Sequence, residues 1–267
     1  RCIEEAGNWH ADTLTEDLDL SYRAQLIGWR FVFLKDFTSP AELPSEINAL
    51  KAQQFRWTKG AVETAKKILP LVWKSKVPLR VKLQSTFHLT NNLVFPFILL
   101  AAILNVPLIF IKNSGAHEIY FAIMSLFVLA FVSSFLFYLY SQKDIHTDWR
   151  KRIVLFPLFM AGSMGLAVNN SRAVFEGLMN RKSEFVRTPK FKQESDKDTF
   201  IGNKYLNKKL GLSVFVEAVL AVYCFIGVLS SIYFMELASI PFQVLFTLGF
   251  SFIAYTSIKH AYATKKI

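Results

Sequence analysis

The sequence contains little cysteine, little histidine and comparatively few acidic residues. Of its 267 residues, 2 are cysteines, Cys2 and Cys224, which lie too far apart along the chain to form a metal-binding or redox motif. The 5 histidines are scattered and have no neighbouring cluster of carboxylates, so we expect no metal site built within the chain. Disulfide scaffolds are therefore excluded, and a hydrophobic content of 52% also excludes a disordered chain.

Basic residues outnumber acidic residues by 31 to 20, which gives a formal net charge of +11. Such an excess of positive charge can bind nucleic acid. This chain, however, has a mean hydropathy of +0.31, and in a hydrophobic chain the same excess is typical of cytoplasmic loops beside a membrane. We therefore expect membrane lipids, and no nucleic acid, among its partners.

The chain starts at Arg1 and has no basic segment followed by an apolar run, as a signal peptide would have. Its first residues already have the composition of the middle of a folded domain. We therefore expect the chain to be the C-terminal fragment of a longer protein, with part of any active site upstream of Arg1.

Residues 1–76 have the mixed composition of a cytosolic domain. Thr15, followed by two acidic residues, predicts the start of a helix that ends at Gly28. The apolar residues 31–34 predict a short buried strand. Ser45 predicts the cap of a second helix, in which apolar or bulky side chains recur at helical spacing: Ile47, Leu50, Gln54, Trp57 and Ala61.

After this domain the sequence predicts an amphipathic interfacial helix over residues 77–91 and then long apolar runs. Four runs of 19 to 23 residues contain one charged side chain among them, Glu217; they are residues 92–111, 119–140, 212–234 and 240–258. A hydrocarbon core needs about 20 residues, so we expect four transmembrane helices. Glu217 is either a functional intramembrane acid or a side chain that reaches the cytoplasmic interface.

The charges of the loops predict the topology. Residues 141–152 and 179–210 are rich in Lys and Arg, whereas residues 112–118 contain one Lys and residues 235–239 contain none. By the positive-inside rule the two basic loops face the cytoplasm. Residues 153–178 lie between the two basic loops and are therefore expected to form an interfacial or re-entrant helix. The N-terminal part and the C-terminus would both be cytoplasmic.

Two short motifs in residues 1–76 combine side chains that could carry chemistry. In Thr15-Glu16-Asp17 the acids either are favoured by the dipole of the helix start or provide a carboxylate that takes a proton from a hydroxyl nucleophile. In Gln53-Gln54-Phe55-Arg56-Trp57, positions 53, 56 and 57 share one helical face. That face could hold a phosphate and a sugar, or it could belong to an ordinary amphipathic helix with Trp57 against the core.

Taken together, the two motifs resemble the TED and Q(Q/R)xRW motifs of family 2 glycosyltransferases. The resemblance is to the processive membrane branch, which contains cellulose synthase, mannan synthases and hyaluronan synthase. Gly28-Trp29, the membrane bundle and the string Phe185-Val-Arg-Thr188-Pro-Lys190 extend it along the chain. This string is similar to the gating-loop motif FxVTxK of cellulose synthases, with Arg187 where the family has Val.

The resemblance implies a role for each matching residue. Asp17 would be the general base that deprotonates the acceptor hydroxyl, and Glu16 beside it would shape the acceptor end. Trp57 would stack on the acceptor sugar, while Gln53, Gln54 and Arg56 would bind the donor diphosphate or the acceptor terminus. In the cytoplasmic loop of residues 179–210, three residues would close over the nucleotide: Phe185, Thr188 and Lys190. The Mg²⁺ or Mn²⁺ of the family would be bound by carboxylates upstream of Arg1, so no metal ligand is expected in this chain.

The resemblance thus implies an α/β and membrane α-helical fold, in which the end of a GT-A-like cytosolic domain precedes a four-span bundle in the inner membrane. We expect inverting transfer from a UDP- or GDP-sugar to a growing β-linked polysaccharide that is exported through the bundle. The fragment alone would be inactive. The alternative is a non-processive enzyme that glycosylates a membrane lipid. A transporter subunit without chemistry would leave the cytosolic motifs unexplained.

Overall fold

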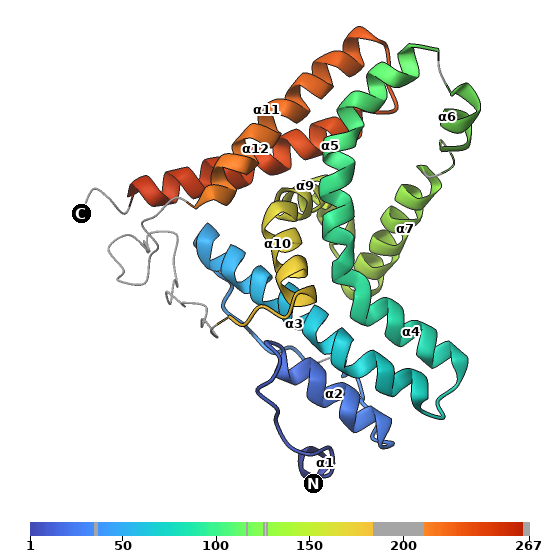
Figure 1. The fold of residues 1–267 in the computed structure, drawn as a ribbon, viewed down its shortest axis with the longest axis vertical. Coiled ribbons are helices and arrows are strands. Elements are labelled where there is room, and N and C mark those ends of the chain that lie inside the picture. Colours follow the sequence, from blue (N-terminus) through green and yellow to red (C-terminus); the bar gives the residue numbers. More distant parts are fainter. Residues whose placement is uncertain (35–36, 116, 125, 127, 184–210, 264–267) are drawn as a thin grey trace. The chain divides into compact units, whose positions relative to one another are not determined.

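A computed structural model describes the chain except for residues 35–36, 116, 125, 127, 184–210 and 264–267 (Figure 1). The described residues form helices and no strand. The chain divides into two compact units. The first unit holds Arg1–Phe97, Ala167–Leu210 and Thr256–Ile267, and the second holds Ile98–Leu166 and Gly211–Tyr255. Both motifs that could carry chemistry lie in the first unit.

In the first unit, three helices pack against the long helix α3 (Ile47–Lys74), as Figure 1 shows: α2 (Glu16–Leu26), α4 (Leu79–Thr90) and α10 (Ala167–Leu178). The short helices α1 (Cys2–Glu5) and η1 (Asn91–Leu93) complete the unit. The core between α2, α3 and α4 consists of fully or partly buried apolar side chains: Ala65, Ile68, Val72, Leu89, Leu18, Tyr22, Leu26, Leu69 and Val77. Each fully buried aliphatic side chain of this kind contributes about 1.5–3 kcal/mol, so this core holds α2 and α4 against α3.

The two helices predicted in residues 1–76 are present. α2 begins directly after Thr15, and Gly28 follows its end with φ +102°, a backbone conformation that favours glycine. The prediction that Ser45 caps the second helix is wrong. The buried carboxylate of Glu46 is the cap instead, because it accepts a hydrogen bond from the Ala49 N–H at 2.8 Å.

The predicted buried strand at residues 31–34 is wrong. These residues are irregular, and Phe33 is 87% exposed. A strand needs the backbone of a neighbouring strand to satisfy its own N–H and C=O groups. No segment in the described parts of the chain provides such a partner, so the expected α/β character is not seen there.

The second unit contains the apolar helices. They are most of α5 (Val94–Asn113), then α6 (Glu118–Met124), α7 (Val128–Ile145), α8 (Trp149–Ile153), α9 (Phe156–Gly165), α11 (Leu212–Tyr233) and most of α12 (Ile240–Ala263). Three helical stretches among the described residues are long and apolar enough to cross a membrane: Leu79–Asn113, Leu212–Tyr233 and Ile240–Tyr262. The expected span at residues 119–140 is described as the separate helices α6 and α7, so a fourth span stays a prediction.

Small residues allow α9 and α12 to approach closely. A Cβ atom added to Gly249 would lie 2.2 Å from the Ala161 carbonyl oxygen, and one added to Gly165 would lie 2.3 Å from the Gly249 carbonyl oxygen. This is the small-residue packing that is common between membrane helices.

Residues 153–178 were expected to form one interfacial helix. The structure has two helices there, α9 in the second unit and α10 in the first. Its place at the membrane surface stays a prediction. Glu217 is fully buried within α11, and its depth in the membrane stays a prediction.

Candidate functional site

The start of α2 is fixed against α3 by close contacts within the first unit. The Thr15 and Thr64 hydroxyls lie 3.1 Å apart in a buried hydrogen bond, and the Leu14 N–H donates to Glu63 Oε2 at 3.0 Å. Gly60 makes this approach possible, because a Cβ atom there would lie 2.7 Å from Thr15 Cγ2. The TED motif therefore contacts α3 at Gly60, one helical turn after Arg56 and Trp57. The packing of α2 against α3 fixes its position.

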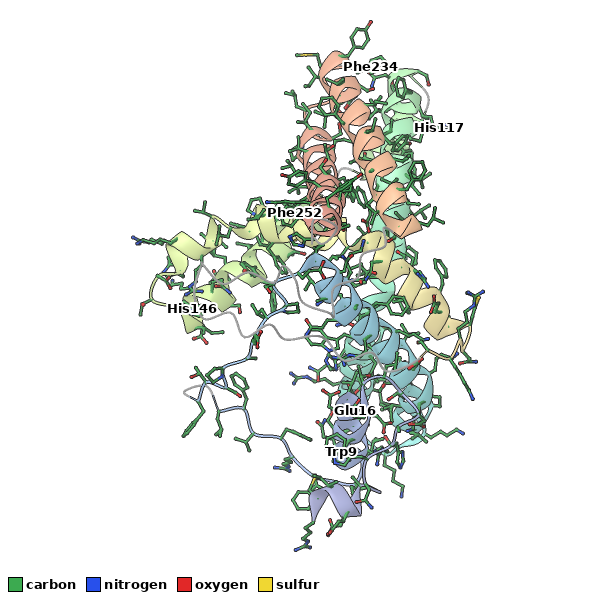
Figure 2. All side chains as sticks on the ribbon, turned by 90° about the vertical axis from the view of Figure 1, so that its left-hand side faces the viewer. Trp9, Glu16, His117, His146, Phe234 and Phe252 are labelled. Atoms are coloured by element: carbon green, nitrogen blue, oxygen red, sulfur yellow. The ribbon has the colours of Figure 1, made fainter. Side chains whose placement is uncertain are left out.

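A cavity of about 430 Å³ opens at this junction and brings residues of both predicted motifs together. We refer to it as the TED cavity. Figure 2 shows Trp9 and Glu16 at the α2 side of the first unit. Side chains from α2, α3, α4, η1 and the segment before α2 form the cavity wall: Trp9, Leu14, Thr15, Glu16, Asp17, Leu18, Arg56, Trp57, Ala61, His88, Asn91 and Asn92.

The charged groups of the TED cavity are accessible. Asp17 is exposed, and its Oδ1 accepts a hydrogen bond from the Leu18 N–H at 2.8 Å within the first turn of α2. Glu16 is half-buried. A carboxylate oriented by a backbone N–H at the edge of a cavity can accept a proton from a bound hydroxyl group. The helix dipole favours the same acid, so both interpretations of the motif remain compatible with this geometry.

Arg56 and Trp57 lie across from these acids on α3. Trp57 is 49% exposed and lines the cavity, so it is not the core residue that the alternative interpretation required. A guanidinium next to an exposed indole can bind anionic or hydroxyl groups and the apolar face of a sugar. Gln53 and Gln54 are partly buried on the same helix but do not line the cavity. Phe185, Thr188 and Lys190 lie outside the described residues.

Sequence reasoning missed Trp9, which lines the TED cavity and is 55% exposed. Gly7 (φ +85°) and Asn8 (φ +63°) form a left-handed turn before it, and Arg23 Nη2 donates to the Asn8 carbonyl oxygen at 2.7 Å. The Gly-Asn pair was the available signal, because both residue types tolerate positive φ. The turn and its arginine hold Trp9 at the cavity.

His88, Asn91 and Asn92 are polar residues at the start of the predicted membrane region. The structure places all three in the wall of the TED cavity. His88 Nδ1 also lies 2.7 Å from the Tyr22 hydroxyl, and the two rings stack at a centroid distance of 5.9 Å. The start of the predicted membrane region thus contributes polar groups to the candidate site.

A cluster of possible metal ligands on the α2 side is organised around a lysine. His10, Asp12 and Asp19 could offer three ligand atoms within 4.8 Å of one another. Lys67 Nζ lies 3.0 Å from His10 Nδ1, 2.9 Å from Asp12 and 3.0 Å from Asp19. The hydrogen bond that Lys67 donates to Asp12 lowers the pKa of the Asp12 carboxyl group. The ammonium supplies the positive charge that a cation would bring, so this cluster does not fit a catalytic Mg²⁺ or Mn²⁺.

The residues of the TED cavity fall within a match to a known protein family. The model of the family described as glycosyl transferase family group 2 matches residues 1–142, which is more than half of the chain and includes both motifs. The chain belongs to this family. The family match therefore covers α1 to α6, most of α7, every predicted site residue of the TED cavity and the first two predicted spans.

Three curated proteins of related sequence come from plants. "Probable glucomannan 4-beta-mannosyltransferase 10" of Arabidopsis thaliana is 33% identical over 196 residues, which is 70% of this chain and 33% of the relative. Number 15 of the same organism is 37% identical over 93 residues, or 35% of this chain and 17% of the relative. Number 3 of Oryza sativa subsp. japonica is 43% identical over 77 residues, or 28% of this chain and 14% of the relative. This chain thus spans a third or less of the length of these relatives. No solved structure gives a significant match.

Proposed function

We propose that the protein containing this chain is a membrane-embedded glycosyltransferase that adds a sugar from a nucleotide-sugar donor to a growing β-linked polysaccharide. The observation that carries the proposal is the TED cavity, in which an accessible carboxylate pair, an arginine and an exposed indole meet. Membership of glycosyl transferase family group 2 and the apolar helices support it. The names of the relatives favour transfer of a mannosyl residue and a 4-β-linked product. We propose a GDP- or UDP-linked donor.

In the proposed reaction the acceptor hydroxyl oxygen attacks the anomeric carbon of the donor sugar. A new C–O bond forms on one face while the bond to the nucleotide diphosphate breaks on the other, so the configuration is inverted. Asp17 takes the proton of the hydroxyl group, and Glu16 beside it shapes the acceptor end. Trp57 stacks on the acceptor sugar, and Arg56 binds the diphosphate or the acceptor terminus, with Gln53 and Gln54 behind it on α3.

Other parts of the proposal lie outside the described residues. We propose that Phe185, Thr188 and Lys190 cover the bound nucleotide. The Mg²⁺ or Mn²⁺ would neutralise charge on the departing diphosphate, bound by ligands outside this chain. We further propose that the helices of the second unit provide the path by which the glycan leaves the cell.

The change Asp17→Asn in the full-length protein tests the proposal. Asn keeps the size of the side chain and is accommodated near a helix start, so folding, membrane insertion and donor affinity should stay intact. Turnover should fall by at least about a hundredfold, because a general base typically contributes 10²–10⁴-fold. The measurement is incorporation of labelled sugar by membranes, together with donor binding.

Asp148→Asn is the control, because Asp148 is likewise a carboxylate at the start of a helix, as the N-cap of α8, and lies outside the candidate site. It should keep wild-type incorporation. Wild-type incorporation by Asp17→Asn would remove the base from the proposal. The length of the labelled product separates a polymer from a single transfer to a lipid.

A further inference from the structure

A second cavity, open to solvent, lies beside the TED cavity and is lined by α2, the end of α3, and α4. Its volume is about 360 Å³, within the range typical of small-ligand sites. Its floor is apolar and includes Leu26, Val72 and Val77, which belong to the core between these helices. The cavity therefore has a rigid base formed by packed helices. We refer to it as the glutamine cavity, after Gln25 and Gln84 in its wall.

The polar groups of the glutamine cavity are hydroxyls, carboxamides and an imidazole. Ser21, Gln25, Gln84 and Ser85 line it together with Tyr22 and His88, and among the residues that the structure describes no Asp, Glu, Lys or Arg does so. Burial raises the pKa of Tyr22, which keeps its hydroxyl neutral. Neutral donors and acceptors above an apolar floor match the hydroxyl groups and C–H faces of a sugar unit.

Absence of charge from this wall distinguishes the cavity from its neighbours. The TED cavity contains Glu16, Asp17 and Arg56, and the chain as a whole carries +11. Phosphate groups in proteins are bound by Arg, Lys or helix N-termini. A nucleotide or an anionic lipid headgroup would therefore find no cationic side chain in the wall, whereas a neutral saccharide needs none.

The two cavities share one side chain. His88 lines both, and its Nδ1 is fixed 2.7 Å from the hydroxyl of Tyr22, which lines the glutamine cavity alone. A ligand made of linked units could place one unit beside Asp17 and Trp57 and a further unit beyond His88.

We infer that the glutamine cavity is a binding site for a neutral saccharide unit of the acceptor glycan, beyond the unit that occupies the TED cavity. This inference rests on the proposed function for the identity of the glycan. It assigns Gln25 of α2 and Gln84 of α4 to hydrogen bonds with sugar hydroxyls and His88 to the boundary between the two units.

The test compares β-1,4-linked mannobiose with mannotetraose as probes of the full-length protein in detergent, with affinities measured by saturation-transfer NMR. Wild type should bind the tetraose at least about tenfold more tightly than the biose, since about 1.4 kcal/mol of extra contact suffices. The double variant Gln25→Leu/Gln84→Leu keeps side-chain size at two exposed positions and should reduce tetraose affinity to that of the biose. Gln142→Leu at the end of α7 is the control and should bind both probes as wild type does.

Three results would overturn the inference: equal affinities for the two probes in wild type, an unchanged ratio in the double variant, or displacement of the tetraose by inorganic phosphate. The last result would identify an anion site. Asp17→Asn separates this inference from the proposed function, because it should lower turnover by at least about a hundredfold and leave both affinities intact. Turnover that survives Asp17→Asn contradicts the function, whereas a double variant with wild-type tetraose affinity contradicts only the glutamine cavity.

Discussion

Gly60 is the residue on which the geometry of the TED cavity depends. A Cβ atom at this position would lie 2.7 Å from Thr15 Cγ2 and 2.8 Å from the Leu14 carbonyl carbon. Backbone atoms cannot yield as a flexible side chain can, so Gly60→Ala must displace the start of α2 from α3. We expect a loss of about 1–3 kcal/mol of stability. Turnover should fall by about tenfold to a hundredfold, because a displacement near 1 Å is costly in catalysis.

Gly162→Ala is the matched control for Gly60→Ala. Gly162 is also a helical glycine, but a Cβ atom there meets nothing within 4 Å. The extra methyl group should leave turnover unchanged and raise stability slightly, because Ala is the better helix former. Thermal unfolding and sugar incorporation measure both variants. If Gly60→Ala kept full turnover, the contact between Gly60 and Thr15 would not position the acids.

Trp57 offers a second test at the residue scale. Its exposed indole provides a flat apolar face to the cavity, and aromatic rings pack against the C–H faces of sugars. Trp57→Phe should keep partial activity, and Trp57→Ala should lose nearly all of it while donor affinity changes little. Trp73→Ala, on the same helix but outside both cavities, should stay active. Equal activity of Trp57→Ala and wild type would show that the indole does not contact the acceptor.

At the scale of elements, the sequence predicted the helices α2 and α3 correctly, but it did not predict the missing strand or which side chains are exposed. The acidic first turn of α2 and the long periodic pattern of α3 depend on local preferences, which a single sequence contains. The strand at residues 31–34 was wrong because a strand depends on partners far away in the chain. Trp57 looked compatible with the core because helical periodicity identifies a face but not what covers it. Trp9 was missed because its place depends on a turn of two left-handed residues.

Lys59 illustrates the same limit, since a lysine in an amphipathic helix is normally solvated, yet this one is fully buried. Its Nζ lies 4.0 Å from Glu63 of α3 and 3.8 Å from Glu176 of α10, and it donates to the Arg181 carbonyl and to Ser183 Oγ. It therefore ties α10 to the helix that carries Trp57.

We expect Lys59→Met to destabilise the protein by about 3–5 kcal/mol, because two acids would lose a buried cation. Glu176→Leu in the same chain should recover part of this loss, which makes the pair suitable for a double-mutant cycle. Lys74→Met, at the exposed end of α3, should change stability by no more than about 0.5 kcal/mol. Denaturant unfolding of the full-length protein provides the measurement. A Lys59→Met variant as stable as wild type would contradict the coupling of α3 and α10.

For the molecule as a whole, the two loops with few basic residues come together within the second unit. Asn113 Nδ2 donates to Glu236 Oε1 at 3.1 Å, and Lys112 forms an ion pair with the same carboxylate. The loop after α5 and the loop after α11 therefore lie at one end of this unit. Because both loops contain few basic residues, we predict that this end of the unit faces outward.

The resulting topology can be tested by labelling. After alanine replaces Cys2 and Cys224, single cysteines at positions 146, 195 and 262 should react with an impermeant thiol reagent only from the cytoplasmic side. Cysteines at positions 115 and 237 should react only from outside. Four crossings produce this pattern, because residues 119–140 must return the chain to the cytoplasm before the basic loop of residues 141–152. Labelling of position 146 from outside would mean that α6 and α7 do not cross, which would leave three spans. Labelling of position 195 from outside would instead mean that residues 153–178 cross the membrane.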